Sequence, residues 1–460
     1  MKTGSRPALG PDALLAPLGA ALRDVAADEA DIWVHRRRAA ITRYSRSSIH
    51  QNALSDETHV HARAIVGSAI GSASGNAVDL LSLRELLARA AALARMQAPN
   101  ADWPGLADRG EYRPPGAFDP ATAAAGASEQ AAAVGRICDA VDARGFRAAG
   151  THSVEVTEDA VANTNGVAAY APATVAYCRA LVLGDHGGSG YADDLSQRLD
   201  DLDPEGIAAR ASEKCALDRD RRPLVPGDYE AVFEEDAVAE ILRIMSLTGL
   251  SGASVHDGRS FMVGAIDRPV TGARFTLHDD ALHPGQLAIP FDPEGTPKRR
   301  VTLVERGVAR GPVYDRWSAK RAGTASTGHA ADYGRYAHGG HAGNLVMAGG
   351  TATRDQLIAS VGHGILITRF HYTNTPDPKR ATMTGTTRDG TLLIEDGRVA
   401  GALPNLRYTM SALDLFAGIE LLGPRRLVRD WWTTNGMGSI VCLAPAMKVS
   451  RATITGASPL

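Results

Sequence analysis

The sequence has little cysteine, few aromatic residues and no long apolar run. Its four cysteines, Cys138, Cys178, Cys215 and Cys442, form no CxxC pair, which argues against a paired-cysteine zinc site and against a disulfide scaffold. Aromatic residues make up only 5% of the chain. No window holds the roughly 18 apolar residues that a membrane-spanning helix needs. We therefore expect reduced cysteines and no membrane partner.

The chain also lacks an excess of charge of one sign. Its 49 basic and 52 acidic residues give a formal net charge of -3, and no long basic block stands out, so nucleic acid is not an expected partner. The N-terminal stretch places Pro7, Pro11 and Pro17 among its apolar residues and does not read as a signal peptide. These observations predict a cytoplasmic protein.

The length of 460 residues exceeds what one hydrophobic core usually supports, so we expect two or three domains. In the first, 1–115, a helical pattern over 12–27 precedes strand-like stretches and an amphipathic pattern over 78–96, with a turn at 71–75. This order predicts an N-terminal helix–strands–helix unit. Prolines crowd residues 98–120 and mark its end, because proline continues neither a helix nor a central strand.

Residues 116–226 are expected to form a middle α/β domain that contains a hairpin. A helix is predicted over 129–142, and strands over 146–156 and 173–183 flank the turn Asn163-Thr-Asn-Gly166. A loop is expected at 186–190, and a helix over 193–218. In the third domain, 227–460, one helical segment over 236–247 precedes many short strands, which predicts a β-rich C-terminal domain. The expected fold class is α+β.

Several short segments in the last half of the chain are similar to those of a known family. They are Asp279–Gly285, Pro290–Gly295, Arg299–Gly307, Ser326–Gly328, Asn344–Gly350, Gly364–Thr373 and Ile394–Gly397. On these segments the chain resembles the TldD/PmbA (TldD/TldE) peptidase family, and in particular its TldE/PmbA-like members, which lack the HExxxH motif.

The resemblance implies a specific reading of the helix near residue 236. In TldD-type subunits, HExxxH supplies two zinc-binding histidines and a general-base glutamate, and a distant cysteine completes the zinc site. Here Glu235 and Glu240 stand at the histidine places and Asp236 at the glutamate place. Zinc prefers imidazole or thiolate, and carboxylates alone suit harder cations. The motif is degenerate, so no metal is expected in this chain, and zinc is expected in a TldD-like partner.

Two details, one in this helix and one in the cysteine segment, leave alternatives open. Acidic residues such as Glu235 and Asp236 are also favoured in a helix's first turn by capping and by the helix dipole. The family's distant cysteine falls near a glycine-rich segment, for which Gly436–Ser439 is the counterpart, and Cys442 follows a few residues later. Cys442 is therefore displaced from the expected ligand position.

Other polar residues of the C-terminal domain are candidates for substrate contacts. Arg369, His371 and Tyr372 could line a peptide channel, since a guanidinium recognises carboxylates and carbonyls. In an unbroken strand Arg369 and His371 would share one face and Tyr372 the other. The histidines crowd one stretch and could instead be hydrogen-bonded or solvated. They are His329, His338, His341, His363 and His371, of which His329, His363 and His371 are the channel candidates.

The resemblance implies a subunit of a heterodimeric zinc metallopeptidase that cleaves peptides or peptide-like biosynthetic intermediates. The expected partners are a TldD-like HExxxH subunit and a peptide. Two alternatives stay open: a non-catalytic homodimeric binding or scaffold protein, and a self-sufficient hydrolase in which Glu235, Asp236 and Glu240 hold another cation.

Overall fold

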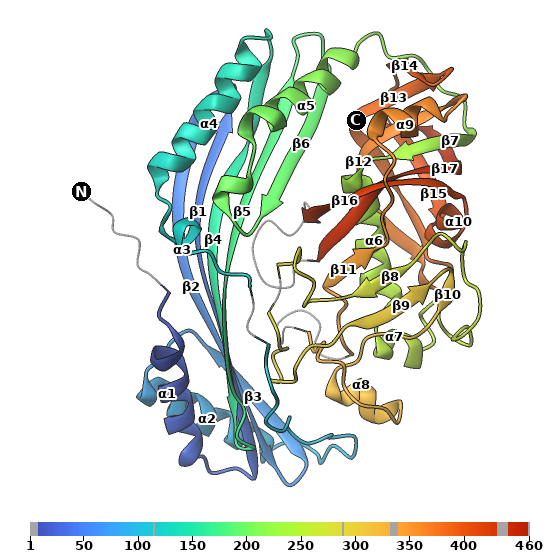
Figure 1. Cartoon of the computed structure of the whole chain (residues 1–460). Coiled ribbons are helices and arrows are strands. Elements are labelled where there is room, and N and C mark those ends of the chain that lie inside the picture. Colours follow the sequence, from blue (N-terminus) through green and yellow to red (C-terminus); the bar gives the residue numbers. More distant parts are fainter. Residues whose placement is uncertain (1–7, 114–115, 288, 332–338, 430–439, 459–460) are drawn as a thin grey trace.

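The computed structural model describes residues 8–113, 116–287, 289–331, 339–429 and 440–458. Within these ranges the strands form a six-stranded sheet, in the order β3-β2-β1-β4-β5-β6, and an eleven-stranded sheet that belongs to the C-terminal half. Figure 1 shows the six-stranded sheet as a long curved wall with the C-terminal half against one of its faces. The mixture of helices and sheets confirms the α+β fold class.

The N-terminal unit begins with α1 (Pro11–Arg23), followed by β1 (Glu29–Ser45), β2 (Ser48–Val66), β3 (Ala69–Gly75) and α2 (Leu80–Ala94). This order matches the predicted helix–strands–helix unit. The expected turn at 71–75 is wrong, because these residues complete β3 and pair with β2. The expected boundary near 115 falls on residues 114 and 115, which lie outside the described residues, and it stays a prediction.

The middle segment continues the same sheet. It contains α3 (Pro120–Ala124), α4 (Ala127–Asp142), β4 (Arg147–Asn163), β5 (Ala168–Leu183), β6 (Ser189–Ser196), the short 3-10 helix η1 (Leu199–Asp201) and α5 (Pro204–Leu217). The predicted hairpin is confirmed, since β4 and β5 pair antiparallel across the turn. Because β1 pairs with β4, the N-terminal and middle segments share one sheet.

The helix expected over 193–218 starts later than predicted. Residues 189–196 pair with β5 as β6, and α5 begins only at Pro204, where Asp203 caps the helix by accepting a hydrogen bond from the Gly206 N–H at 2.9 Å. The expected loop at 186–190 is shorter for the same reason, because Ser189 and Gly190 already belong to β6.

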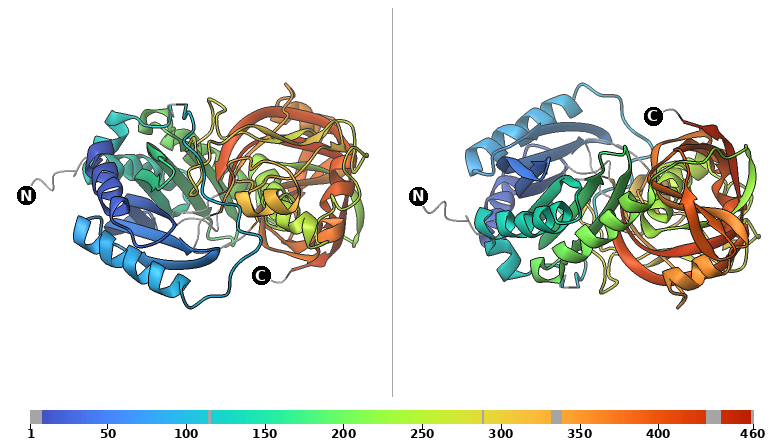
Figure 2. Two further views of the ribbon diagram at one scale, coloured as in Figure 1. Left: turned by 90° about the horizontal axis from the view of Figure 1, so that it is seen from below. Right: turned by 90° about the horizontal axis from the view of Figure 1, so that it is seen from above.

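The two faces of the six-stranded sheet bury different residues. Along β1, Ala30, Ile32 and Val34 pack into the core under α1 and α2, while Trp33 packs with Phe291 of the C-terminal half. This follows from the alternation of side chains along a strand. Figure 2 shows the helices on one side of the sheet and the C-terminal half on the other.

Two glycines allow helices to lie directly on this sheet. A Cβ on Gly71 in β3 would lie 2.1 Å from the Ala90 carbonyl oxygen of α2, and a Cβ on Gly190 in β6 would lie 2.0 Å from the Ala211 carbonyl oxygen of α5. No side chain fits at either position. Glycine is therefore required by close packing between helix and sheet.

The C-terminal half wraps strands around a central helix, α6. Its elements are β7 (Gly227–Phe233), α6 (Glu235–Gly249), α7 (Gly252–His256), β8 (Leu277–Asp279), β9 (Val301–Glu305), β10 (Val308–Ala309), α8 (Arg316–Arg321), β11 (Asn344–Met347), α9 (Arg354–Ala359), β12 (His363–Asp377), η2 (Pro378–Arg380), β13 (Thr382–Glu395), β14 (Arg398–Ala402), β15 (Leu406–Ser411), α10 (Ala412–Ala417), β16 (Ile419–Arg429) and β17 (Val441–Ala457). α6 packs into the largest core, together with residues of β12 and β17. In the described ranges no helix is long and apolar enough to cross a membrane.

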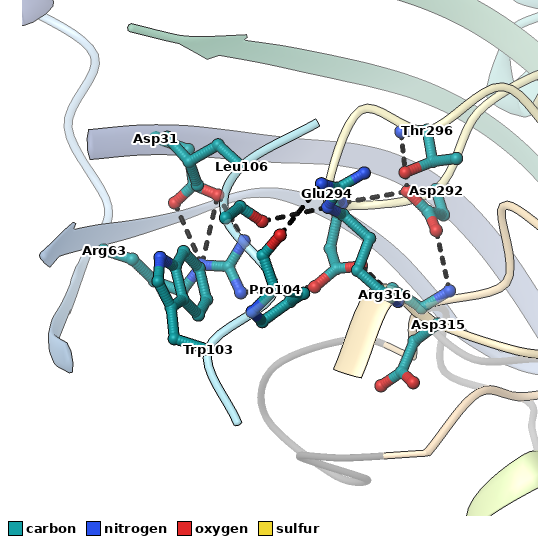
Figure 3. A network of polar contacts seen from close by, with 12 residues as sticks. Asp31, Arg63, Trp103, Pro104, Leu106, Asp292, Glu294, Thr296, Asp315 and Arg316 are labelled. Carbon is teal, nitrogen blue, oxygen red and sulfur yellow. Dashed lines mark hydrogen bonds and ion pairs between the residues drawn. The ribbon is translucent and has the colours of Figure 1, made fainter. Parts of the chain in front are cut away.

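A polar network joins the two halves near α8 (Figure 3). Arg63 of β2 pairs with Asp31 of β1 and also donates to Glu294 of the C-terminal half at 3.4 Å. Arg316 of α8 donates to the Gly105 carbonyl at 3.0 Å, which fixes the segment that leaves α2. All three ion-paired side chains are buried, so the network sets how the halves meet.

Candidate functional site

The helix α6 carries the three positions that the sequence analysis singled out. Glu234 occupies the N-cap with extended backbone, and Glu235 and Asp236 follow in the first turn. Acidic residues are favoured there by the helix dipole. The remaining helix is buried along most of its length, so its N-terminus has a fixed position. Lys214 of α5 donates to Glu234 at 2.5 Å and joins this N-terminus to the middle segment.

Asp236 is bound by an arginine. Arg426 of β16 donates to Asp236 at 2.6 Å and to Asp193 of β6 at 2.8 Å, so one guanidinium serves two carboxylates. Tyr191 donates a further hydrogen bond to Asp193 at 3.0 Å. Burial, with the charge of Asp193 as a second cause, raises the pKa of Asp236 to about 7. Arg426 opposes that shift by favouring the carboxylate.

The other two motif positions also lie beside arginines. Arg243 binds Glu240 with two hydrogen bonds of 3.0 Å, and Glu240 is buried. Glu235 is partly exposed and lies 3.9 Å from Arg426. These carboxylates have guanidinium partners where a zinc site would offer imidazoles, so the residues present do not fit zinc. Among the described residues, no group of three or more histidines, cysteines or acids is placed to hold a metal.

The structure brings Asp236, Glu240 and Arg369 together around one small cavity. Its volume is ≈10 Å³, and Tyr191 and Arg429 complete much of its wall. A space of this size holds about one water molecule and no part of a peptide. The carboxylates of α6 therefore line a space for water, whereas the larger cavities of this part of the molecule lie elsewhere.

Arg369 contacts Asp389 and Tyr191 of the same chain. Its Nε donates to Asp389 at 2.9 Å, and its guanidinium stacks on Tyr191 at 4.8 Å from the ring centre. Asp389 also accepts from Ser189 of β6 at 3.0 Å. These contacts link β12 of the C-terminal half to β6, so Arg369 stabilises the junction between the halves.

His371 and Tyr372 lie further along β12. Their rings meet edge-on with centroids 4.6 Å apart, and Tyr372 is 61% exposed. Burial, together with the charges of Arg388 and Arg369, lowers the pKa of His371 to about 4. His371 is therefore neutral at pH 7, and Tyr372 is an exposed aromatic surface.

Of the remaining candidate histidines, His329 and His341 are neighbours, whereas His363 lies on β12. His363 is exposed at the start of β12, eight residues before His371, which is roughly 26 Å along an extended strand. His329 is fully buried and bonds Asp279 at 2.9 Å. Burial lowers the pKa of His341 to about 4. The backbone N–H of His341 donates to the His329 backbone carbonyl at 2.8 Å. His338 lies outside the described residues.

Cys442 lies close to α6 in space although it is far from that helix in the sequence. It lies in β17, and its Sγ is 4.0 Å from the Ala239 carbonyl of α6. Gly436–Ser439, the other expected counterpart of the family's cysteine segment, lies outside the described residues. The cysteine and the degenerate motif thus lie on neighbouring elements, although no local pattern predicts that contact.

Two larger cavities between the halves were not predicted from the sequence. One, of ≈180 Å³, lies between Trp33 and His35 of β1 and the segment that contains Phe291 and Lys298. His35 is fixed there by Asp159 at 3.0 Å. The other, of ≈190 Å³, is lined by Arg63, Trp103 and Glu294 beside the network of Figure 3. Their residues come from segments far apart in the chain, which is why local patterns did not reveal them.

Comparisons with known proteins identify the family and the fold of this chain. The family model described as the PmbA/TldA metallopeptidase C-terminal domain matches residues 226–456, and the corresponding central-domain model matches residues 113–216. The structure superposes on the crystal structure of TldE from Thermococcus kodakarensis with a TM-score of 0.86 and 21% identity, covering 96% of this chain and 100% of that one. That likeness establishes the fold.

Curated relatives match over shorter stretches. The chain is 22% identical over 182 residues to Metalloprotease PmbA of Escherichia coli O157:H7, which covers 39% of this chain and 38% of that protein. It is 25% identical over 223 residues to the Metalloprotease TldD homolog of Buchnera aphidicola subsp. Acyrthosiphon pisum, covering 45% and 44%. These matches span less than half of each relative. With the family models spanning most of its length, the chain belongs to the PmbA/TldD metallopeptidase family.

Proposed function

We propose that this chain is the TldE/PmbA-like subunit of a zinc metallopeptidase whose zinc site lies on a TldD-like partner. The observation that carries the proposal is the pairing of the α6 carboxylates with arginine. Arg426 binds Asp236 at 2.6 Å, and Arg243 binds Glu240 with two hydrogen bonds of 3.0 Å. A metal ion entering this site would displace or repel both guanidinium groups, which carry a permanent positive charge.

The substrate class in this proposal is a peptide or a peptide-like biosynthetic intermediate. The cavities between the halves, of ≈180 and ≈190 Å³, are large enough for single side chains and offer both apolar and charged walls. This chain would form part of the chamber wall and position the substrate, while the partner's zinc supplies the hydrolytic water. A cytoplasmic location and domain boundaries near 115 and 226 belong to the same proposal.

The test is reconstitution from separately purified subunits. The chain and the HExxxH-bearing partner are expected to co-elute in size-exclusion chromatography, and peptide cleavage should require both. Full cleavage by the partner alone would remove the role of this chain. A stable homodimer that neither binds the partner nor cleaves peptide would instead support a scaffold protein. Cleavage by this chain alone would make it a self-sufficient hydrolase.

A further inference from the structure

The segment between β8 and β9 forms a groove that the proposed function does not explain. An open depression of ≈440 Å³ is lined by Arg113, Lys298, Arg299 and Arg300, together with Glu111 and Asp280. A smaller depression of ≈130 Å³ shares Arg113 and His283 with it, so the two adjoin. We call the larger depression and its lining residues the basic groove.

The cations that line the basic groove outnumber the carboxylates that line it, and Lys298 in addition favours the ionised forms of the buried Asp279 and Asp292 outside the lining. Lys298 donates to the Asn344 side-chain oxygen at 3.1 Å, and Arg299 donates to the Ala325 carbonyl at 3.2 Å. Both acceptors are uncharged. Arg300 donates to the His278 ring nitrogen at 2.8 Å and lies 3.9 Å from Asp280, which in the described part of the chain is the one groove carboxylate within ion-pair distance of a groove cation. Four cations thus face two carboxylates, of which one is engaged.

This imbalance favours an anionic ligand. Arg299 and Arg300 are exposed, and an arginine fork binds a carboxylate with two parallel hydrogen bonds. The other walls include Pro284, Pro290 and Pro297, whose ring nitrogens donate no hydrogen bond. Recognition in the groove therefore depends on its charged side chains. A volume of ≈440 Å³ accommodates a few residues of an extended peptide.

The groove leads toward the junction of the halves. Lys298 lines both the basic groove and the ≈180 Å³ cavity beside Trp33 and His35. A chain held by the groove cations would therefore reach the cavity between the halves, whose walls are partly apolar and partly charged. This continuity connects the charged surface to the part of the molecule in which the proposed chamber lies.

A peptide fits the groove better than a nucleic acid does. The described lining residues include no phenylalanine, tyrosine or tryptophan, and their one ring, His283, is bound at Nδ1 by the Gly285 N–H at 3.1 Å, so the groove offers no row of rings on which successive bases could stack. The chain as a whole carries a formal net charge of -3, which does not favour a polyanion over a long path. A short run of carboxylates needs only the few cations that the groove provides.

We propose that the basic groove binds an acidic segment of a peptide, with Lys298, Arg299 and Arg300 holding its carboxylates. The inference rests on the proposed function in that it names the class of peptide that the enzyme selects. Binding is measured on this chain alone, without the partner. A failure to bind acidic peptide is therefore distinct from a failure to assemble an active enzyme.

The experiment measures binding of fluorescein-labelled dodecapeptides by anisotropy. One peptide is rich in glutamate, a second has glutamine in place of glutamate, and a third has lysine. The wild-type chain should bind the glutamate peptide at least about tenfold more tightly than the glutamine peptide, and its affinity should fall as salt is added. Equal affinity for the glutamate and glutamine peptides would overturn the proposal.

A matched pair of variants locates the binding. Arg299→Glu/Arg300→Glu should weaken binding of the glutamate peptide by about tenfold or more. The control, Arg89→Glu/Arg144→Glu, makes the same change in net charge at exposed positions on α2 and just after α4. It should change affinity by less than about twofold, since neither residue lines the groove and the charges of exposed residues are screened by salt. Equal losses in both variants would contradict a localised site.

Two further measurements keep the result decisive. Circular dichroism and thermal melting check that each variant folds, and Arg299→Gln/Arg300→Gln replaces the charge-reversed variant if that one does not. A single-stranded DNA oligonucleotide serves as the competing ligand. Tighter binding of the oligonucleotide than of the glutamate peptide, lost in the groove variant, would assign the groove to nucleic acid and overturn the proposal.

Discussion

The guanidinium of Arg426 lies 2.6 Å from the carboxylate of Asp236, the helix position that the resemblance to TldD-type subunits assigns to the general-base glutamate. The same guanidinium reaches Asp193 of the six-stranded sheet at 2.8 Å. One side chain therefore binds a carboxylate of α6 and a carboxylate of the sheet, and so joins α6 to the sheet. This relationship links the absence of histidine from the motif to the way in which the two halves of the molecule meet.

Replacing Arg426 should destabilise the protein strongly. Arg426→Ala leaves Asp236 and Asp193 without their shared cation, and because the Arg426 side chain is itself partly exposed, the loss should cost about 1–3 kcal/mol. Urea unfolding followed by circular dichroism measures the loss. The neighbouring Arg425 is exposed, so Arg425→Ala should change the free energy of unfolding by less than about 0.5 kcal/mol. Equal losses in the two variants would refute the bridging role of Arg426.

Glu294 should make stability depend on pH. Burial, together with the charges of Asp292 and Asp315 and against that of Arg63, raises the pKa of Glu294 from 4.5 to about 7. A raised pKa favours folding at low pH, and this contribution is lost as pH rises through about 7. Glu294→Gln removes the effect. The variant's free energy of unfolding should therefore rise relative to wild type between pH 5 and 8, by at most ~1.4 kcal/mol per pH unit.

Chemical denaturation at a series of pH values measures that difference. The control is Glu85→Gln, which makes the same change of side chain at an exposed position of α2. A difference for Glu294→Gln that stays constant from pH 5 to 8, or that falls over this range, would show that Glu294 is ionised throughout and that burial does not govern its titration.

The close packing of α2 on the sheet predicts a contrast between two glycines. A Cβ at Gly71 would lie 2.1 Å from the Ala90 carbonyl oxygen, so Gly71→Ala forces the helix off the strand and should cost about 1–3 kcal/mol. Gly135 in α4 has no atom within 4 Å of a built Cβ, and Gly135→Ala should stabilise the helix by up to about 1 kcal/mol. Thermal melting of both variants checks the sign of each effect. A similar melting temperature for the two would contradict the packing account.

The elements that the sequence predicted well depend on local patterns. The helical spacing over 236–247 identified α6, and the Asn163–Gly166 turn identified the hairpin of β4 and β5. A helix was predicted over 193–218, but residues 193–196 belong to β6 and α5 begins only at Pro204. Pairing with β5 determines the outcome instead, since it satisfies the backbone hydrogen bonds of β6.

The site was only partly predictable. The family resemblance identified Asp236 and Glu240 by their positions. Of their two arginine partners, one could be predicted from the sequence and the other could not. Arg243 is three residues from Glu240 and lies on the same helix face. Arg426 meets Asp193 across 233 positions of sequence, and no local pattern encodes a contact of that separation. The basic groove was not predicted for the same reason, because Arg113 is far in sequence from Lys298, Arg299 and Arg300.

The zinc content of the isolated chain tests the central claim most directly, because the claim is that arginines bind the carboxylates at the motif positions of α6. Elemental analysis of protein purified without chelator should find far less than one zinc per chain, and Glu235→Ala/Glu240→Ala should leave that value unchanged. One tightly held zinc per chain, lost in Glu235→Ala/Glu240→Ala, would contradict the account and make this chain a metallopeptidase in its own right.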